Sequence, residues 1–368
     1  MNGLERLSET VVSHSLQLKE NDKVLITCDT DKPKLLVKLL VEKIIENKGV
    51  PYIRIVDPEL EAYLLQCTKP NRISTLQKSA EFDVKNYDCF IYIHYTCNDY
   101  EDKNVPLETR LAVEDATKDS DVIRVNKRRW VLLNYPSPLD AYKAGMPNWE
   151  YFNYAMDAMN IDYRMMRKHI EPLKQLMERT KEVRMVGPGT DITFSIEGMP
   201  AIPCCGEYNI PDGEIFTAPI RDSVQGVITY NTRSFYKGNV YENIKLVFEN
   251  GKIIQADAPF HQKQLQEIFD TDEGARYIGE FSFGLNPKIL HSMGDILYDE
   301  KIIGSIHFTP GSAYQEAYNG NDSKVHWDLV WIQRSEYGGG EVYFDHTLIR
   351  KDGFFVLPEL QHLNYDLK

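Results

Sequence analysis

The 368-residue chain predicts a mixed α/β (α+β) fold with two domains. At roughly 100 to 200 residues per domain, this length accommodates two hydrophobic cores. Strand and helix patterns alternate in the first half, whereas short alternating strand patterns separated by turns dominate the second half. We therefore expect an N-terminal α/β domain at residues 1–180 with a partly parallel sheet, and a C-terminal β-rich domain at residues 181–368.

The first half carries the alternation that βαβ units require. Lys23–Cys28 is a short apolar run, Lys32–Asn47 places leucine and isoleucine at helical spacing, and Pro51–Val56 returns to a strand pattern. Further apolar runs at Tyr87–His94 and Val122–Val131 extend the series. These segments predict the partly parallel sheet.

Two helical stretches, Trp149–Ala158 and Tyr163–Thr180, connect the halves, and we place the domain boundary near residue 180. Beyond it, Asn243–Ala258 alternates on both sides of Asn250-Gly251, a dipeptide that favours a type I′ hairpin turn. The second half is therefore expected to form antiparallel sheet. Its other expected elements are a helix at His261–Phe269 and strands at Lys301–Phe308, Val325–Gln333 and Glu341–Ile349.

The charge and the apolar content of the chain indicate whether nucleic acid or a membrane is an expected partner. The chain has 42 Lys and Arg against 55 Asp and Glu, a formal net charge of −13. Its one dense cationic cluster, Lys127–Arg129, is small, so nucleic acid is not expected as a partner. No apolar run approaches the roughly 18 residues of a membrane span, so no membrane association is expected.

Cysteine usage indicates the compartment. The six cysteines include no C-x-x-C pair, and a chain of this length does not need a disulfide framework. The N-terminal stretch also lacks the pattern of a signal peptide. We therefore expect a cytoplasmic protein.

One histidine–carboxylate pair is a candidate for metal binding. His326 and Asp328 lie two positions apart on a predicted strand, so both side chains point to the same face, and Trp327 points to the other. An imidazole beside a carboxylate can ligate a divalent ion. A cross-strand salt bridge is the alternative interpretation of the same pair.

Two carboxylates and a second histidine extend this set. Glu214 and Glu280 lie in apolar strand contexts, and His307 ends a predicted strand. A buried carboxylate needs a cation, whereas an exposed one faces solvent, and both interpretations stay open for each glutamate. All these residues lie in the β-rich half, where one antiparallel sheet could bring them together.

Six segments of the second half share their motifs with one known family. They are Gly189–Phe194 (GTDITF), Asn209–Pro219 (NIPDGEIFTAP), Phe248–Lys252 (FENGK), Gly279–Asn286 (GEFSFGLN), Tyr298–Tyr314 (YDEKIIGSIHFTPGSAY) and Asn321–Val330 (NDSKVHWDLV). In this order they resemble the thermophilic aminopeptidase family of metallopeptidases, the aminopeptidase T or aminopeptidase S type. The first half resembles that family only in its α/β texture.

The resemblance implies a metal-dependent aminopeptidase that removes the N-terminal residue from peptides with a free N-terminus. It also implies a catalytic C-terminal domain that holds two divalent metal ions, and a homodimer. Residue by residue, the family's metal ligands fall on Glu214, Glu280, His307, Tyr314, His326 and Asp328. The loop Phe308–Gly311 departs from the family pattern, which has a small apolar pair before the glycine.

The expected chemistry follows from these residues. Two ions about 3.5 to 4 Å apart would bridge a water, lower its pKa and polarise the scissile carbonyl. We expect Glu280 to bridge the ions, and Tyr314 either to ligate a metal, to stabilise the oxyanion or to pack as a plain aromatic side chain. Proton transfer is left to a carboxylate at the metal site or to the bridging water, and Glu214 would suit the role if it stands off the metals. Zn²⁺, Co²⁺ and Mn²⁺ all suit such ligands.

Two other functions stay open at this stage. One is another binuclear metallohydrolase, such as an amidase or esterase. The other is a non-catalytic peptide-binding dimer of the same fold.

Overall fold

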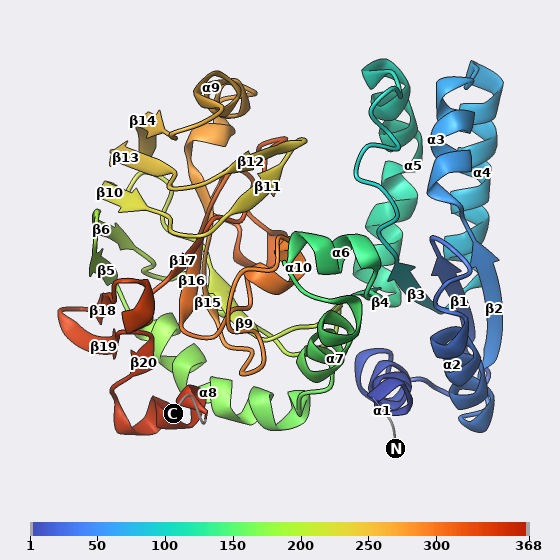
Figure 1. Ribbon diagram of the computed structural model, residues 1–368, viewed down its shortest axis with the longest axis horizontal. Coiled ribbons are helices and arrows are strands. Elements are labelled where there is room, and N and C mark those ends of the chain that lie inside the picture. Colours follow the sequence, from blue (N-terminus) through green and yellow to red (C-terminus); the bar gives the residue numbers. More distant parts are fainter. Residues whose placement is uncertain (1–2, 366–368) are drawn as a thin grey trace. The chain divides into compact units, whose positions relative to one another are not determined.

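The computed structural model describes residues 3–365 (Figure 1). The chain forms two compact units, one running to residue 160 with residues 206–211, and one comprising residues 161–205 and those from 212 onward. One unit holds a parallel sheet and the other antiparallel sheets, which confirms the mixed α/β fold class. The units divide near residue 160, and the domain boundary near residue 180 stays a prediction.

The first unit is built on a five-stranded sheet with strand order β2-β1-β3-β4-β8, parallel throughout. Its helix α2 buries Leu36, Leu40 and Ile44, because residues four apart lie on one helical face. Its strands are β1 (Lys23–Cys28), β2 (Val50–Ile55), β3 (Cys89–His94), β4 (Arg129–Asn134) and β8 (Asn209–Ile210). Its helices are α1 (Gly3–Thr10), the π-helix η1 (Val11–Ser15), α2 (Lys34–Glu46), α3 (Pro58–Gln66), α4 (Pro70–Asn86), α5 (Leu107–Lys127), α6 (Pro138–Lys143) and α7 (Asn148–Met159).

The strand predicted at Val122–Val131 is wrong over its first half. Residues up to Lys127 belong to helix α5, and strand β4 begins at Arg129. The glutamate, lysine and arginine residues of α5 are good helix formers, and Val122 is 50% exposed on its surface. The apolar run therefore joins the end of a helix to the start of a strand.

The second unit contains an eight-stranded sheet of order β14-β13-β10-β6-β5-β18-β19-β20, a five-stranded sheet of order β17-β16-β15-β9-β7, and the pair β11-β12. Its strands are β5 (Glu182–Gly187), β6 (Thr190–Ser195), β7 (Ile202–Cys204), β9 (Glu214–Thr217), β10 (Gln225–Thr229), β11 (Ser234–Tyr236), β12 (Asn239–Tyr241), β13 (Lys245–Glu249), β14 (Lys252–Asp257), β15 (Ile278–Gly284), β16 (Ser305–Pro310), β17 (Val330–Ile332), β18 (Glu341–Phe344), β19 (Thr347–Lys351) and β20 (Phe354–Phe355). Its helices are α8 (Tyr163–Arg179), α9 (Gln262–Phe269), η2 (Gly274–Arg276), α10 (Ile296–Asp299), η3 (Gln315–Ala317), η4 (Ser335–Tyr337) and η5 (Pro358–Asn364).

The hairpin predicted around Asn250-Gly251 is confirmed as the β13-β14 pair. The two residues adopt φ angles of +51° and +79°, the left-handed conformations that a type I′ turn requires. The predicted helix at His261–Phe269 is confirmed as α9.

Two predicted strands are shorter than expected. Strand β16 begins at Ser305 instead of Lys301, because the chain turns through Gly304 at φ +78°. Strand β17 begins only at Val330, and His326 before it forms an isolated bridge to Gly311. These two corrections concern segments that carry candidate site residues. A third predicted strand, Glu341–Ile349, is wrong as a single element, because a turn at Asp345-His346 divides it into the antiparallel strands β18 and β19.

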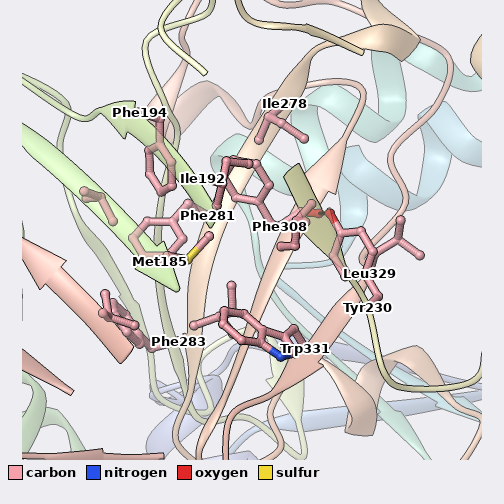
Figure 2. Close-up of a cluster of buried hydrophobic side chains, with 14 of the residues drawn as sticks. Met185, Ile192, Phe194, Tyr230, Ile278, Phe281, Phe283, Phe308, Leu329 and Trp331 are labelled. Atoms are coloured by element: carbon pink, nitrogen blue, oxygen red, sulfur yellow. Dashed lines mark hydrogen bonds between the residues drawn. The ribbon is translucent and has the colours of Figure 1, made fainter. Parts of the chain in front are cut away.

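Aromatic side chains from both larger sheets form the core of the second unit (Figure 2). The ring of Phe194 on β6 lies 5.0 Å from that of Phe281 on β15 and 4.9 Å from that of Phe308 on β16. Because strand side chains alternate, this core occupies one face of the five-stranded sheet. Its opposite face carries polar residues beside a smaller hydrophobic cluster around Phe216.

Over residues 3–365, no helix has both the length and the apolar character needed to cross a membrane.

Candidate metal centre

The polar face of the five-stranded sheet carries Glu280 and His307. Glu280 pairs with Thr309, and Phe281 pairs with Phe308. Since Phe281 and Phe308 enter the core, the period of two turns their polar neighbours to the opposite face. Glu214 begins the adjacent strand β9, where it lies opposite Gly284 of β15.

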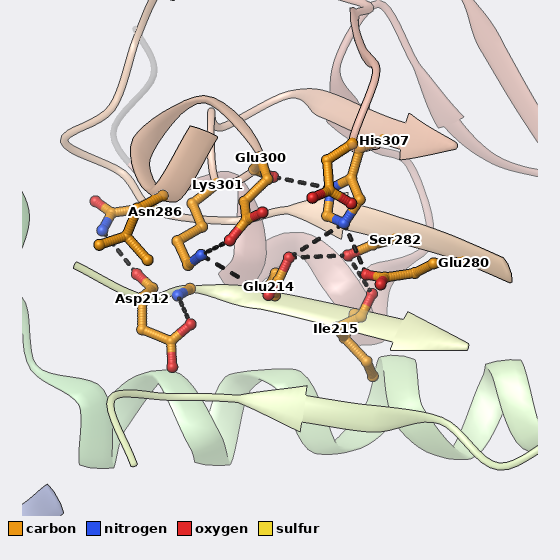
Figure 3. Close-up of polar contacts among 12 residues, drawn as sticks. Asp212, Glu214, Ile215, Glu280, Ser282, Asn286, Glu300, Lys301 and His307 are labelled. Carbon is orange, nitrogen blue, oxygen red and sulfur yellow. Dashed lines mark hydrogen bonds and ion pairs between the residues drawn. The ribbon is translucent and has the colours of Figure 1, made fainter. Parts of the chain in front are cut away.

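Three buried side chains meet on this face (Figure 3). His307 Nε2 lies 2.8 Å from Glu280 Oε1 and 3.4 Å from Glu214 Oε2. The exposed fractions of Glu214, Glu280 and His307 are 7%, 3% and 1%. Potential ligand atoms of all three lie within 4.8 Å of one another.

His326 and Asp328 complete a second group with Glu280. His326 Nε2 lies 3.3 Å from Asp328 Oδ1 and 3.6 Å from Glu280 Oε2, and Thr309 donates a 2.7 Å hydrogen bond to Asp328 Oδ1. The predicted strand does not extend to these residues, yet their side chains face the same site. Glu280 is therefore shared between the two groups.

Backbone carbonyls orient both imidazoles. His307 Nδ1 lies 3.1 Å from the carbonyl oxygen of Glu300, and His326 Nδ1 lies 2.8 Å from that of Ser312. A histidine that donates from Nδ1 to a carbonyl presents Nε2 as its free ligand atom. Both Nε2 atoms point to the carboxylates.

The donor set fits divalent cations. Glu280 Oε2 and His326 Nε2 are buried and have no hydrogen-bond partner among the described residues. Buried polar atoms are normally satisfied, so two such atoms facing each other indicate a missing partner. Imidazole nitrogen and carboxylate oxygen together suit Zn²⁺, Co²⁺ or Mn²⁺.

Electrostatics reflect the concentration of carboxylates. Burial lowers the pKa of His307, but the hydrogen bond and charge of Glu280 outweigh it and raise that pKa to about 10. His326 behaves likewise: burial opposes the charge of Asp328, and its pKa rises to about 10. Burial raises the pKa of Glu214 well above its ordinary value, whereas the two imidazoles bring the pKa of Asp328 below its ordinary value in spite of burial.

Tyr314 borders the cluster next to His326. Its ring lies 4.7 Å from that of His326 and 5.6 Å from that of Phe216, and 49% of the residue is exposed. Desolvation first, and then the charge of Glu280, raise the pKa of the phenol well above its ordinary value. Tyr314 therefore stays a hydrogen-bond donor beside the site.

Sequence reasoning missed Glu300 and Lys301. Lys301 is fully buried, with its ammonium in contact with the Glu300 carboxylate and 3.9 Å from Glu214 Oε1. Burial alone lowers the pKa of Lys301, but these carboxylates raise it above its ordinary value. The sequence does contain a charged pair, Glu300-Lys301, directly before an apolar run. The pair was overlooked because Lys301 was predicted to be the first residue of a strand.

Cys204 and Asp212 form a third group with Glu214. Burial raises the pKa of the Cys204 thiol well above its ordinary value, so the thiol stays protonated and is a poor ligand. The ammonium of Lys301 also disfavours a cation next to this side of Glu214.

Comparison with known proteins defines the class of this protein as a metalloprotease. The chain belongs to the thermophilic metalloprotease family (M29), which matches residues 1–341. The predicted family is thereby confirmed. The match includes the first half, where the sequence showed only a general resemblance.

Individual relatives are aminopeptidases. Aminopeptidase T of Thermus aquaticus is 32% identical over 185 residues, which cover 43% of this chain and 44% of that protein. Aminopeptidase AmpS of Bacillus subtilis is 34% identical over 126 residues, 33% of this chain and 30% of that protein. The matched segments thus span less than half of either relative.

The fold also matches a solved structure. Wild-type AmpT from Thermus thermophilus superposes with a TM-score of 0.79 at 23% sequence identity, over 96% of this chain and 99% of that chain. At this identity the match supports the fold alone, and it extends over both compact units.

Proposed function

We propose that this chain is a metal-dependent aminopeptidase that hydrolyses the N-terminal residue from peptides through a binuclear divalent-metal site. The observation that carries the proposal is the position of Glu280, whose oxygens face different imidazoles. Oε1 lies 2.8 Å from His307 Nε2, and Oε2 lies 3.6 Å from His326 Nε2. A carboxylate shared in this way is suited to bridge two cations.

The proposed ligands divide into two sets that share Glu280. Glu214 and His307 would hold one ion, and His326 and Asp328 the other. Zn²⁺, Co²⁺ and Mn²⁺ are the candidate ions. When bound, such ions lower the pKa of water towards neutrality and polarise a carbonyl group.

The chain's own residues would orient the ligands and transfer protons. Thr309 holds Asp328, and Ser282 donates a 3.3 Å hydrogen bond to Glu214 Oε2. Burial raises the pKa of Glu214, so this residue would suit proton transfer if it stands off the metal ions instead of ligating one. The protonated phenol of Tyr314 would donate a hydrogen bond to the oxyanion or contact a metal.

The proposed substrates are peptides with a free N-terminus. This follows the names of the relatives, which are aminopeptidases. We also propose a homodimer, on the family resemblance, and a cytoplasmic location. The location is supported by the cysteine spacing, which includes no C-x-x-C pair, in a chain long enough not to need a disulfide framework.

Metal analysis combined with an aminoacyl-anilide panel tests the proposal. Purified protein should contain about two divalent ions per chain, lose hydrolysis on chelation and regain it on addition of Zn²⁺, Co²⁺ or Mn²⁺. Anilides with a free amine should be cleaved, whereas their N-acetylated forms should not. Equal cleavage of blocked substrates would favour an amidase, and absence of metal dependence would favour a peptide-binding protein.

A further inference from the structure

We infer that a pocket beside His326 and Asp328 receives an aliphatic side chain from the N-terminal residue of the substrate. The inference rests on the proposed aminopeptidase function and names its substrate class. The pocket has a volume of about 100 Å³ and lies wholly in the second unit. No sequence motif pointed to it.

The pocket borders the proposed metal centre. His326 and Asp328, which form a potential ligand group with Glu280, line it directly. A peptide whose first carbonyl lies at those ligands must place its first side chain in adjacent space. This pocket is bounded by the ligands themselves and is therefore positioned to receive that side chain.

The pocket has an apolar part that is partly open to solvent. Phe235 and Ile296, which line it, are 41% and 44% exposed. The ring of Tyr236 stacks on that of Trp327 with centroids 4.5 Å apart, which gives the pocket a rigid aromatic side. Exposed apolar side chains gathered next to a polar cluster are typical of a ligand site.

Polar groups on strand β11 and its approach are paired within the protein. Thr232 Oγ1 donates to the carbonyl oxygen of Val330 at 2.9 Å, and Ser234 Oγ accepts from Trp327 Nε1 at 2.8 Å. Arg233 Nε donates to Glu242 at 2.6 Å. Each of these bonds occupies one polar atom at the edge of the pocket.

The carboxylate of Asp299, which also lines the pocket, is hydrogen-bonded within the protein. It accepts hydrogen bonds from Ser292 Oγ at 2.6 Å and from the amides of Met293 and Gly294 at 2.5 and 3.0 Å. These bonds hold the loop that contains Gly294, and the ring of Phe235 packs against this glycine. A charged side chain entering the pocket would lose water, and the two ligand residues that line the pocket, His326 and Asp328, are assigned to the proposed metal, so its burial there is unfavourable.

Size selects among apolar side chains. A dry cavity of about 150 Å³ is large enough for benzene, and this pocket measures about 100 Å³. Leucine or valine therefore fits better than phenylalanine or tryptophan. Alanine leaves the pocket largely empty.

A panel of aminoacyl-anilides tests the pocket on the metal-loaded, full-length protein. We expect the leucyl substrate to exceed the alanyl substrate in kcat/KM by at least about 10-fold, the usual minimum for filling an apolar pocket. Phenylalanyl, lysyl and glutamyl substrates should all be slower than the leucyl one. A preference for a charged residue, or no preference at all, would overturn the inference.

Substitutions of residues that line the pocket should change the substrate preference, whereas a substitution elsewhere on the surface should not. Ile296→Trp should lower kcat/KM for the leucyl substrate about 10-fold and leave the alanyl substrate within about 2-fold. Phe235→Ala should raise the ratio of phenylalanyl to leucyl cleavage. Ile254→Trp is the matched control, because Ile254 is 55% exposed on β14 and does not line the pocket; it should change neither ratio. Equal losses on all substrates in Ile296→Trp would contradict the assignment.

Product binding gives a measurement that does not depend on turnover. Calorimetry on the metal-loaded protein should show free leucine binding at least about 10-fold more tightly than free lysine or alanine, with the difference lost in Ile296→Trp. If the panel is not cleaved, the proposed function fails, while calorimetry still decides whether the pocket selects leucine. Equal binding of the three amino acids would refute the pocket even in an active enzyme.

Discussion

Replacing Lys301 with methionine should destabilise the metal-free protein by about 3 to 5 kcal/mol, the usual cost of removing one partner from a buried ion pair. The lysine is fully buried, contacts the Glu300 carboxylate and lies 3.9 Å from Glu214. Methionine retains an apolar stem of similar length, so packing changes little. The loss comes from two carboxylates left without their cation.

Urea unfolding of chelated protein measures this loss. Lys85→Met is the matched control, since Lys85 forms an i,i+4 pair with Glu81 and its side chain is 69% exposed. Surface pairs of this kind contribute little, so the control should unfold close to the wild type. Lys301→Arg, which keeps the charge, should lose less than Lys301→Met.

The pH dependence of the stability difference between wild type and Lys301→Met distinguishes a loss of charge from a loss of packing. Burial raises the pKa values of Glu214 and Glu300, so both carboxyls take up protons readily as pH falls. A protonated carboxyl needs no cation, and the difference between wild type and Lys301→Met should shrink at lower pH. A difference below about 1 kcal/mol, or one independent of pH, would refute the charge argument.

Three further predictions concern the ligands. Glu280→Gln should abolish hydrolysis of an aminoacyl-anilide and lower the metal content, because the shared ligand loses its charge; full activity in this variant would end the ligand assignment. Thr309→Val should weaken metal binding by about 10- to 100-fold in a calorimetric titration, since it removes the 2.7 Å hydrogen bond that orients Asp328, and unchanged affinity would show that this bond is dispensable. The metal-free protein should lose stability as pH rises from about 6.5 to about 10, because the pKa values of His307 and His326 are raised from 6.5 to about 10 in the folded state and the protonated rings stabilise it below that range. Urea unfolding at several pH values checks this, and the decline should be absent in a His307→Gln, His326→Gln double variant.

Patterns that depend on neighbouring residues were readable from the sequence. The Asn250-Gly251 hairpin, helix α9 and strand β1 follow from local turn chemistry and apolar spacing. Predicted strand limits were wrong where an apolar run crosses two elements. The run at Val122–Val131 joins helix α5 to β4, and the turn at Gly304 separates Lys301 from β16.

The sequence by itself determined the fold class, the family and the six candidate site residues, because motifs and periodicities are properties of the chain order. Only the tertiary structure decided which of these residues meet. Antiparallel pairing places Glu280 between His307 and His326, although 27 residues separate it from His307 along the chain. The same packing buries Lys301 against Glu214 and forms the pocket between β11 and the loop before α10. Such contacts depend on strand register and on loops that close at a distance, and no local pattern encodes them.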